Sequence, residues 1–173
     1  MNLASNEVQK VDYIYIGEIV NTHGLKGEVR IISDFKFKES VFKSGIKVYI
    51  GKGHHMETIS SYRVHKNYDM VTFSGLRHIE DVLSFKGEDV YVKRDEIEYE
   101  GYLNEDLINM NVYCNDKLIG HITSILKTNA HEILVIENHK KHMVPNIEEF
   151  VLNVSIPDNR MDIKYIKGLI DED

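Results

Sequence analysis

Short runs of β-branched and aromatic residues, separated by turn residues, recur along the first half of this sequence. Helical spacing interrupts them once, over residues 77–87, where Gly87 is a suitable stop signal. Six short strands with one late helix favour a small closed β-sheet over a parallel α/β layer, because closure removes exposed sheet edges. The six predicted strands are 13–20, 28–33, 46–50, 57–65, 70–73 and 89–92.

The second half repeats the pattern on a smaller scale. Asn115-Asp116 and Asn129-Ala130 are typical of hairpin turns, and a short helix or turn fits 147–150. The sequence therefore predicts a mostly β protein made of two all-β domains. The strands predicted in the second half are 107–114, 118–126, 132–137, 141–144 and 160–166.

An acidic segment, residues 94–106, separates the two halves. It is rich in carboxylates and poor in apolar side chains. We expect a flexible N-terminal tail at 1–12, a first domain at 13–96, an acidic linker at 97–106 and a second domain at 107–173.

The charge differs between the two halves. The chain has 21 Lys and Arg against 28 Asp and Glu, a net charge of −7. Residues 1–96 hold 14 basic and 14 acidic side chains, whereas residues 97–173 hold 7 and 14. The total argues against a general nucleic-acid coat, which needs clustered positive charge. The asymmetry indicates two domains with different partners.

Several protein classes are excluded by simple counts. The single cysteine, Cys114, cannot form an internal disulfide or a four-thiolate metal site, and its apolar strand predicts a small core residue. No apolar run approaches the roughly 18 residues of a membrane span, and residues 1–10 lack the apolar stretch of a signal peptide. We expect a cytoplasmic, soluble protein without a membrane partner.

Nine histidines raise the possibility of a metal site or a catalytic site. His54-His55, His139 and His142 fall in predicted exposed turns, without a neighbouring thiolate or the His-Glu spacing of a zinc hydrolase. Adjacent histidines in a strand also point to opposite faces. We expect solvated loop histidines, no metal and no enzyme.

The most distinctive local feature is the turn between the first two predicted strands. Gly24 and Gly27 permit positive φ and close backbone approach, and Lys26 can project from the tip. Arg30, His23 and Thr22 add further donors, so the loop could contact one or two RNA phosphates. Alternatively, the glycines serve only the turn and the lysine only solubility. A phosphate-binding P-loop is excluded because the GK[ST] ending is missing.

Four segments in this order resemble the RimM family of bacterial ribosome maturation factors. The resemblance extends from about residue 13 to the end. The matching segments are 17–30 (GEIVNTHGLKGEVR), 73–76 (FSGL) with the helix after it, 102–108 (YLNEDLI), and Val144-Pro145 with 167–171 (KGLID).

The resemblance implies an N-terminal six-stranded β-barrel and a C-terminal PRC-type β-barrel, hence two small β-barrels in tandem. It also implies a non-enzymatic, cofactor-free assembly factor that binds the head of the immature small (30S) ribosomal subunit. The expected partner is ribosomal protein S-nineteen with local rRNA contact, the expected role is support of 16S rRNA processing, and the expected state is a monomer. The residues assigned to RNA or ribosome contact are Thr22, His23, Gly24, Lys26, Gly27 and Arg30.

The ribosomal-protein contact is assigned to Tyr102, Leu103 and Asp106. The family usually has paired aromatic residues where this chain has Tyr102-Leu103. It also has Gly where this chain has Asn109, and Phe where it has Asn146. Packing between the domains is the alternative for Tyr102 and Leu103, and capping of the next strand is the alternative for Asp106.

Two other functions remain open at the level of sequence. One is a two-barrel protein–protein adaptor without an RNA role, and the other is a small metal-dependent hydrolase. The acidic second half could steer association with a basic ribosomal protein.

Overall fold

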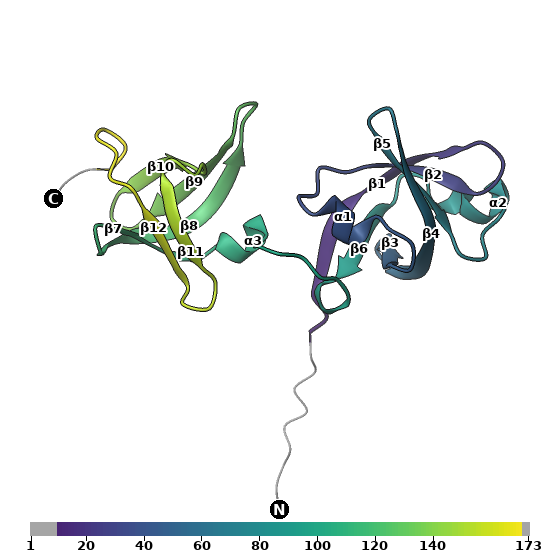
Figure 1. Cartoon of the computed structure of the whole chain (residues 1–173), viewed down its shortest axis with the longest axis horizontal. Helices are drawn as coiled ribbons and strands as arrows, with labels where there is room; N and C mark the ends of the chain where they lie inside the picture. Colours follow the sequence, from purple (N-terminus) through teal and green to yellow (C-terminus); the bar gives the residue numbers. More distant parts are fainter. Residues whose placement is uncertain (1–9, 171–173) are drawn as a thin grey trace, which may run out of the picture. The chain divides into compact units, whose positions relative to one another are not determined.

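The computed structural model describes residues 10–170 and divides into two compact units, with the division between Glu100 and Gly101 (Figure 1). Both units are built mainly from strands, which confirms the predicted mostly β fold.

The first unit is a closed barrel with the strand order β1-β2-β5-β4-β3-β6. All six predicted strands are present, and the predicted helix is a turn of α-helix followed by a 3₁₀ turn. Two short helical turns, α1 and η2, were not predicted. The elements are β1 (Tyr13–His23), β2 (Glu28–Ile32), α1 (Lys38–Val41), β3 (Lys47–Ile50), β4 (His55–His65), β5 (Tyr68–Phe73), α2 (Ile79–Val82), η1 (Leu83–Phe85), β6 (Asp89–Lys93) and η2 (Arg94–Glu96).

Tyrosines line the outer face where the barrel closes. Tyr15 of β1 and Tyr49 of β3 both pair in register with Tyr91 of β6. The rings of Tyr15 and Tyr91 meet edge to face at 5.9 Å, and Tyr13 meets Tyr49 in the same way at 5.3 Å. Aromatic cross-strand pairs of this kind stabilise strand pairing beyond their buried area. They therefore favour closure of β1 and β3 onto β6.

A buried carboxylate joins three elements of the first barrel. Asp69 of β5 is 2% exposed, and its two oxygens accept hydrogen bonds from Lys38 Nζ and Tyr62 Oη, each at 2.7 Å. A buried charge is tolerated only when it is paired and hydrogen-bonded in this way. Burial and the bond to Asp69 raise the pKa of Tyr62 to about 12. The pair with Lys38 fixes α1 against the sheet.

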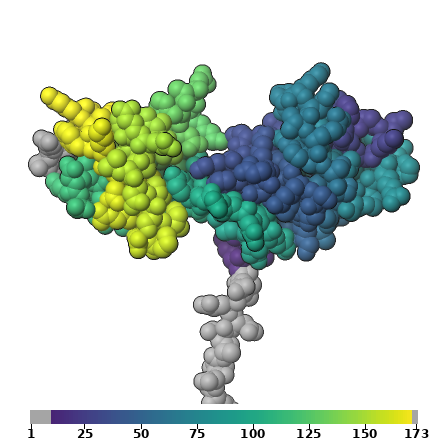
Figure 2. Space-filling view, in the orientation of Figure 1, coloured from purple at the N-terminus to yellow at the C-terminus, as the bar shows by residue number. Residues whose placement is uncertain are grey.

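The termini of the first barrel are held by contacts within the same unit. Arg94 Nε donates to Asp12 Oδ2 at 2.6 Å, so the predicted tail 1–12 is attached to the barrel at residue 12. Residues 1–9 of that tail are outside the part of the chain that the structure describes. The ring of Phe37 stacks on that of Tyr99 at 4.8 Å. Figure 2 shows these two segments side by side, dark blue against teal.

The second unit is a six-stranded sheet with the order β10-β9-β8-β7-β12-β11. β12 pairs in parallel with β7, and the other neighbours are antiparallel. Val112, Ile122, Ile136 and Val144 are fully buried in its core. The elements are α3 (Asn104–Leu107), β7 (Asn111–Cys114), β8 (Lys117–Lys127), β9 (Glu132–Glu137), β10 (Lys141–Pro145), β11 (Val151–Ser155) and β12 (Arg160–Ile163).

Several details of the second unit differ from the prediction. Residues 107–110 are not strand, because α3 ends at Leu107 and Asn109 turns the chain with φ +67°. β11 was missed because its side chains do not alternate between buried and exposed. The predicted last strand, 160–166, ends at Ile163. The turn at Asn115-Asp116 is confirmed, with positive φ at both residues.

Candidate functional site

The β1–β2 loop has the glycine geometry that its sequence predicts. Gly24 has φ +65° and Gly27 has φ +78°, both in the left-handed region that favours glycine. The surroundings of the two glycines differ. A Cβ on Gly24 would meet no atom within 4 Å, whereas a Cβ on Gly27 would lie 2.7 Å from the carbonyl oxygen of Leu76. Gly27 is therefore required both for its backbone angle and for close packing.

The loop is anchored to the segment that begins α2. The backbone N–H of Ile79 donates to the carbonyl of Leu25 at 3.0 Å, and Figure 1 shows the hairpin tip beside α2. Asp81 caps the same segment by accepting the backbone N–H groups of Arg77 and His78, both at 3.0 Å. These bonds anchor the tip to the α2 segment although Leu25 is 76% exposed.

The basic side chains of the loop point to different environments. Lys26 is exposed, and its Nζ has no hydrogen-bond or ion-pair partner within residues 10–170. Arg30 is half-buried: its Nη2 lies 2.8 Å from His23 Nδ1, and its guanidinium lies 5.6 Å from the ring centre of Tyr68. Since an Arg can only donate, His23 Nδ1 is the acceptor in this pair. Lys26 and Arg30 are the groups that could donate to an anion.

Strand pairing brings one further basic side chain, Arg63, close to Arg30, and the sequence did not predict it. Arg30 and Arg63 lie opposite the same residue of β5, Met70, on either side of it. Arg63 binds Glu28 through two bonds of 2.9 and 2.6 Å. These bonds lower the pKa of the Glu28 carboxyl, and its burial opposes them. Arg63 comes from 33 residues further along the chain, and only the strand register brings it here.

The other predicted site residues lie at the start of the second unit. Tyr102 is half-buried and packs against the core of that unit, while Leu103 is only 5% exposed. Asp106 Oδ2 accepts a hydrogen bond from the backbone N–H of Leu103 at 2.8 Å. Asp106 therefore caps the start of α3, whereas the sequence predicted that it could cap the next strand. Burial raises the pKa of the Tyr102 hydroxyl.

Each of the two units matches the model of a known protein family. The model of the RimM N-terminal domain matches residues 14–97, and the model of the RimM PRC barrel domain matches residues 104–169. The chain belongs to the RimM family.

Relatives with the name ribosome maturation factor RimM match the chain over nearly its whole length. The RimM protein of Staphylococcus haemolyticus is 34% identical over 165 residues, which covers 91% of this chain and 99% of the relative. That of Streptococcus mutans is 37% identical over 169 residues, covering 92% and 98%. A solved RimM structure from Pseudomonas aeruginosa is 20% identical, with a TM-score of 0.42 and coverage of 90% and 98%.

Several other histidines of this RimM-family chain, and its cysteine, lie in structural environments, whereas His139 is exposed. His54 stacks on Tyr13 at 3.8 Å, and His55 Nε2 lies 2.8 Å from Glu57 Oε1. His142 is buried with Nδ1 3.1 Å from the carbonyl of Leu169, so the expectation of a solvated loop histidine is wrong there. The alternation of β10 turns this side chain inward. Cys114 is buried as predicted, and burial raises the pKa of its thiol.

Neither a metal-binding cluster nor a membrane-spanning helix is found within residues 10–170. No group of three or more His, Cys, Asp and Glu side chains gathers there in a way that could hold a metal ion. The helices in that range are too short and too polar to cross a bilayer.

Proposed function

We propose that this chain is a non-enzymatic ribosome assembly factor that binds the head of the immature small ribosomal subunit through ribosomal protein S-nineteen and supports 16S rRNA processing. The observation that carries the proposal is the match of both RimM domain models, which together span residues 14–97 and 104–169. Relatives that are 34 and 37% identical over more than 90% of the chain are named for ribosome maturation.

In this proposal the β1–β2 loop contacts RNA at one place. Lys26 donates to a phosphate at the tip, and Arg30 presents the side of its guanidinium that is turned away from His23. Gly24 and Gly27 fix the backbone, while Thr22 and His23 support the base of the loop. A contact of one or two phosphates agrees with the zero net charge of residues 1–96, because a broad RNA surface would need more cations.

The second unit would bind the basic ribosomal protein. Tyr102 offers the accessible part of its ring, Leu103 supports it from inside, and Asp106 holds the turn between them through the Leu103 N–H. The 14 acidic side chains of residues 97–173, against 7 basic ones, would speed association with a positively charged partner. The protein would act in the cytoplasm as a monomer, without a cofactor or a membrane.

Binding to small-subunit precursors tests the RNA contact. At low salt the Lys26→Glu variant should co-sediment with the precursors several-fold more weakly than the unaltered chain, and this difference should shrink as added salt screens the contact. Lys43→Glu is the matched control, because Lys43 is an exposed lysine of the same barrel outside the loop. Equal binding by the two variants would reject the loop as an RNA contact. If RNase treatment of the precursors leaves the binding of both the unaltered chain and Lys26→Glu unchanged, the result would favour a protein–protein adaptor without an RNA role.

The partner of the second unit needs a separate measurement. Titration of purified S-nineteen into the full chain should release heat, and Tyr102→Ala should weaken the affinity. Tyr113→Ala is a control of the same size on β7. No detectable heat with the unaltered chain would reject S-nineteen as the direct partner.

A further inference from the structure

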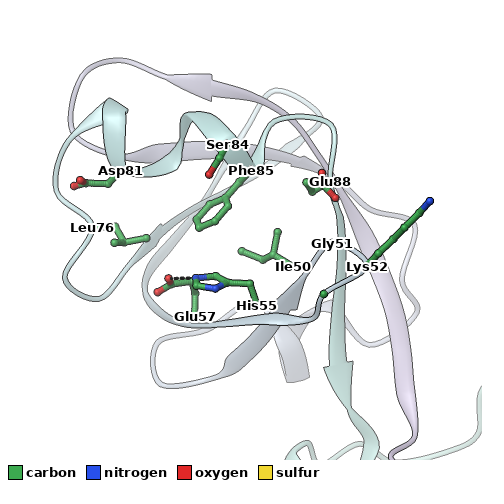
Figure 3. Close-up of a pocket in the computed structure, with 11 residues that line it drawn as sticks. Ile50, Gly51, Lys52, His55, Glu57, Leu76, Asp81, Ser84, Phe85 and Glu88 are labelled. Carbon is green, nitrogen blue, oxygen red and sulfur yellow. Dashed lines mark hydrogen bonds and ion pairs between the residues drawn. The ribbon is translucent and has the colours of Figure 1, made fainter.

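The first barrel contains a pocket that lies outside the residues discussed for RNA contact. It opens between the β3–β4 turn on one side and the α2–η1 segment on the other (Figure 3). Its volume is about 890 Å³, and the apolar part of its lining comes from Ile50, Leu76 and Phe85. Apolar pockets of this size with a few polar groups at the edge are typical binding sites.

The rim of the pocket is acidic. Three carboxylates line it, from Glu57, Asp81 and Glu88, together with the basic residues Lys52 and His55. Figure 3 shows the Lys52 side chain directed away from the other lining residues. His55 lies 2.8 Å from Glu57 Oε1, and 62% of its side chain is exposed. The charge that faces the pocket is therefore negative.

Glu88 is the carboxylate best placed for a ligand. It is half-buried, and within residues 10–170 its oxygens have no hydrogen-bond or ion-pair partner. A Cβ on Gly51 would lie 2.6 Å from Glu88 Oε2, so the carboxylate rests over bare backbone at the pocket wall. A partly desolvated carboxylate gains most from a charged donor, since charge-assisted hydrogen bonds are about twice as strong as neutral ones.

The other two carboxylates are partly engaged. One oxygen of Asp81 already accepts the N–H groups of Arg77 and His78. One oxygen of Glu57 pairs with His55, and its side chain is 16% exposed. They contribute negative potential around the pocket, while Glu88 remains available for a direct bond.

We propose that this pocket binds an arginine or lysine side chain of a basic polypeptide partner. The aliphatic stem would lie on Ile50, Leu76 and Phe85, and the cationic head would reach Glu88. Lys and Arg commonly bury their stems along apolar surfaces while the charged head stays at a polar rim. Phosphate is disfavoured at the same place, because three carboxylates surround it.

The pocket and the β1–β2 loop meet at Leu76. The side chain of Leu76 lines the pocket, and the carbonyl of Leu76 is the atom that a Cβ on Gly27 would touch. One short segment thus has the cationic loop on one side and the anionic pocket on the other. The first barrel can therefore hold a basic protein next to an RNA phosphate. The inference is independent of the proposed role of the second unit.

Nuclear magnetic resonance of the ¹⁵N-labelled full chain tests the pocket. The probe is a blocked pentapeptide, Ala-Ala-Arg-Ala-Ala, and its control has citrulline, an uncharged side chain of the same shape. The arginine peptide should shift the amides of Gly51, Gly53, Phe85 and Glu88, and the citrulline peptide should leave them unchanged. Glu88→Gln should weaken arginine binding about threefold, the range of a single partly exposed ion pair.

A matched variant separates local from general charge effects. Glu80→Gln removes the same charge from an exposed position of α2 that does not line the pocket, and it should leave the affinity unchanged. Equal weakening by Glu80→Gln and Glu88→Gln would overturn the proposal, as would equal shifts from the arginine and citrulline peptides. Shifts of the pocket amides with a single-stranded RNA oligonucleotide, and not with the arginine peptide, would assign the pocket to RNA instead. Retained amide dispersion in the same spectra shows that each variant is folded.

Discussion

Replacing Gly27 by alanine should destabilise the first barrel much more than the same change at Gly24. Both glycines have positive φ, +78° and +65°, so alanine at either position meets the left-handed backbone penalty of about 1–2 kcal/mol. Only at Gly27 does the new Cβ also meet a backbone atom, the Leu76 carbonyl oxygen at 2.7 Å. Overpacking against an atom that cannot rotate away costs about 1–3 kcal/mol more.

The expected loss of unfolding free energy is therefore about 2–5 kcal/mol for Gly27→Ala and about 1–2 kcal/mol for Gly24→Ala. The two units of the chain can unfold separately, so one bulk transition would mix them. Urea unfolding followed by hydrogen exchange and mass spectrometry reads peptides of residues 14–97 apart from the rest. A loss for Gly27→Ala no larger than that for Gly24→Ala would refute the close-packing argument.

Three further predictions concern individual side chains. Asp69→Ala should lower the stability of the first barrel by about 1–3 kcal/mol, because Lys38 and Tyr62 lose their shared acceptor; urea unfolding measures it. Because the pKa of the Glu28 carboxyl is lowered in the folded state, its contribution to stability is present above the unfolded pKa of about 4.5 and is lost as the pH falls through the folded value. Glu28→Gln should therefore reduce the loss of melting temperature with falling pH in a thermal-unfolding series. An unchanged slope on the acid side would contradict this. The buried Cys114 thiol, whose pKa is raised, should react with a disulfide reagent at neutral pH only as fast as the second unit opens, and immediate reaction would show that the strand is exposed.

Local patterns in the sequence are sufficient to predict most of the strands. β9 was predicted at Glu132–Glu137 without error, because its apolar run is bounded by clear turn residues. The positive φ of Gly24 and Gly27 agrees with the prediction from a glycine-rich turn between two strands. These features depend on a few neighbouring residues, which a single sequence supplies directly.

Features that depend on strand pairing were not accessible in the same way. Arg63 binds Glu28 at the start of β2, 35 positions earlier in the chain. No local sequence pattern near either residue indicates this contact. The salt bridge between Lys38 and Asp69 spans 31 positions. β11 (VLNVS) has neither an alternating pattern nor a continuous apolar run like that of β9, so its sequence does not indicate a strand. Long-range pairs of this kind follow from the register of the whole sheet.

The candidate site shows the same division. The exposed Lys26 and the glycine turn were predicted correctly as a loop, whereas the inward orientation of Arg30 toward His23 and Tyr68 required the fold. Asp106 was expected to cap a strand and caps a helical turn, because the YLNED segment forms α3 before β7 starts.

The strand orders have a consequence for synthesis of the chain. The barrel closes through β1 and β6, so it can be completed once Lys93 has emerged, whereas β12 must be present before β7 and β11 can be joined. The 70 residues between Lys93 and Ile163 take about 4–14 s to translate at typical rates. During that interval all strands of the first barrel are available to fold, while the second sheet lacks β12. The β1–β2 loop and the pocket of the first barrel can thus form before the strands of the acidic second unit are complete.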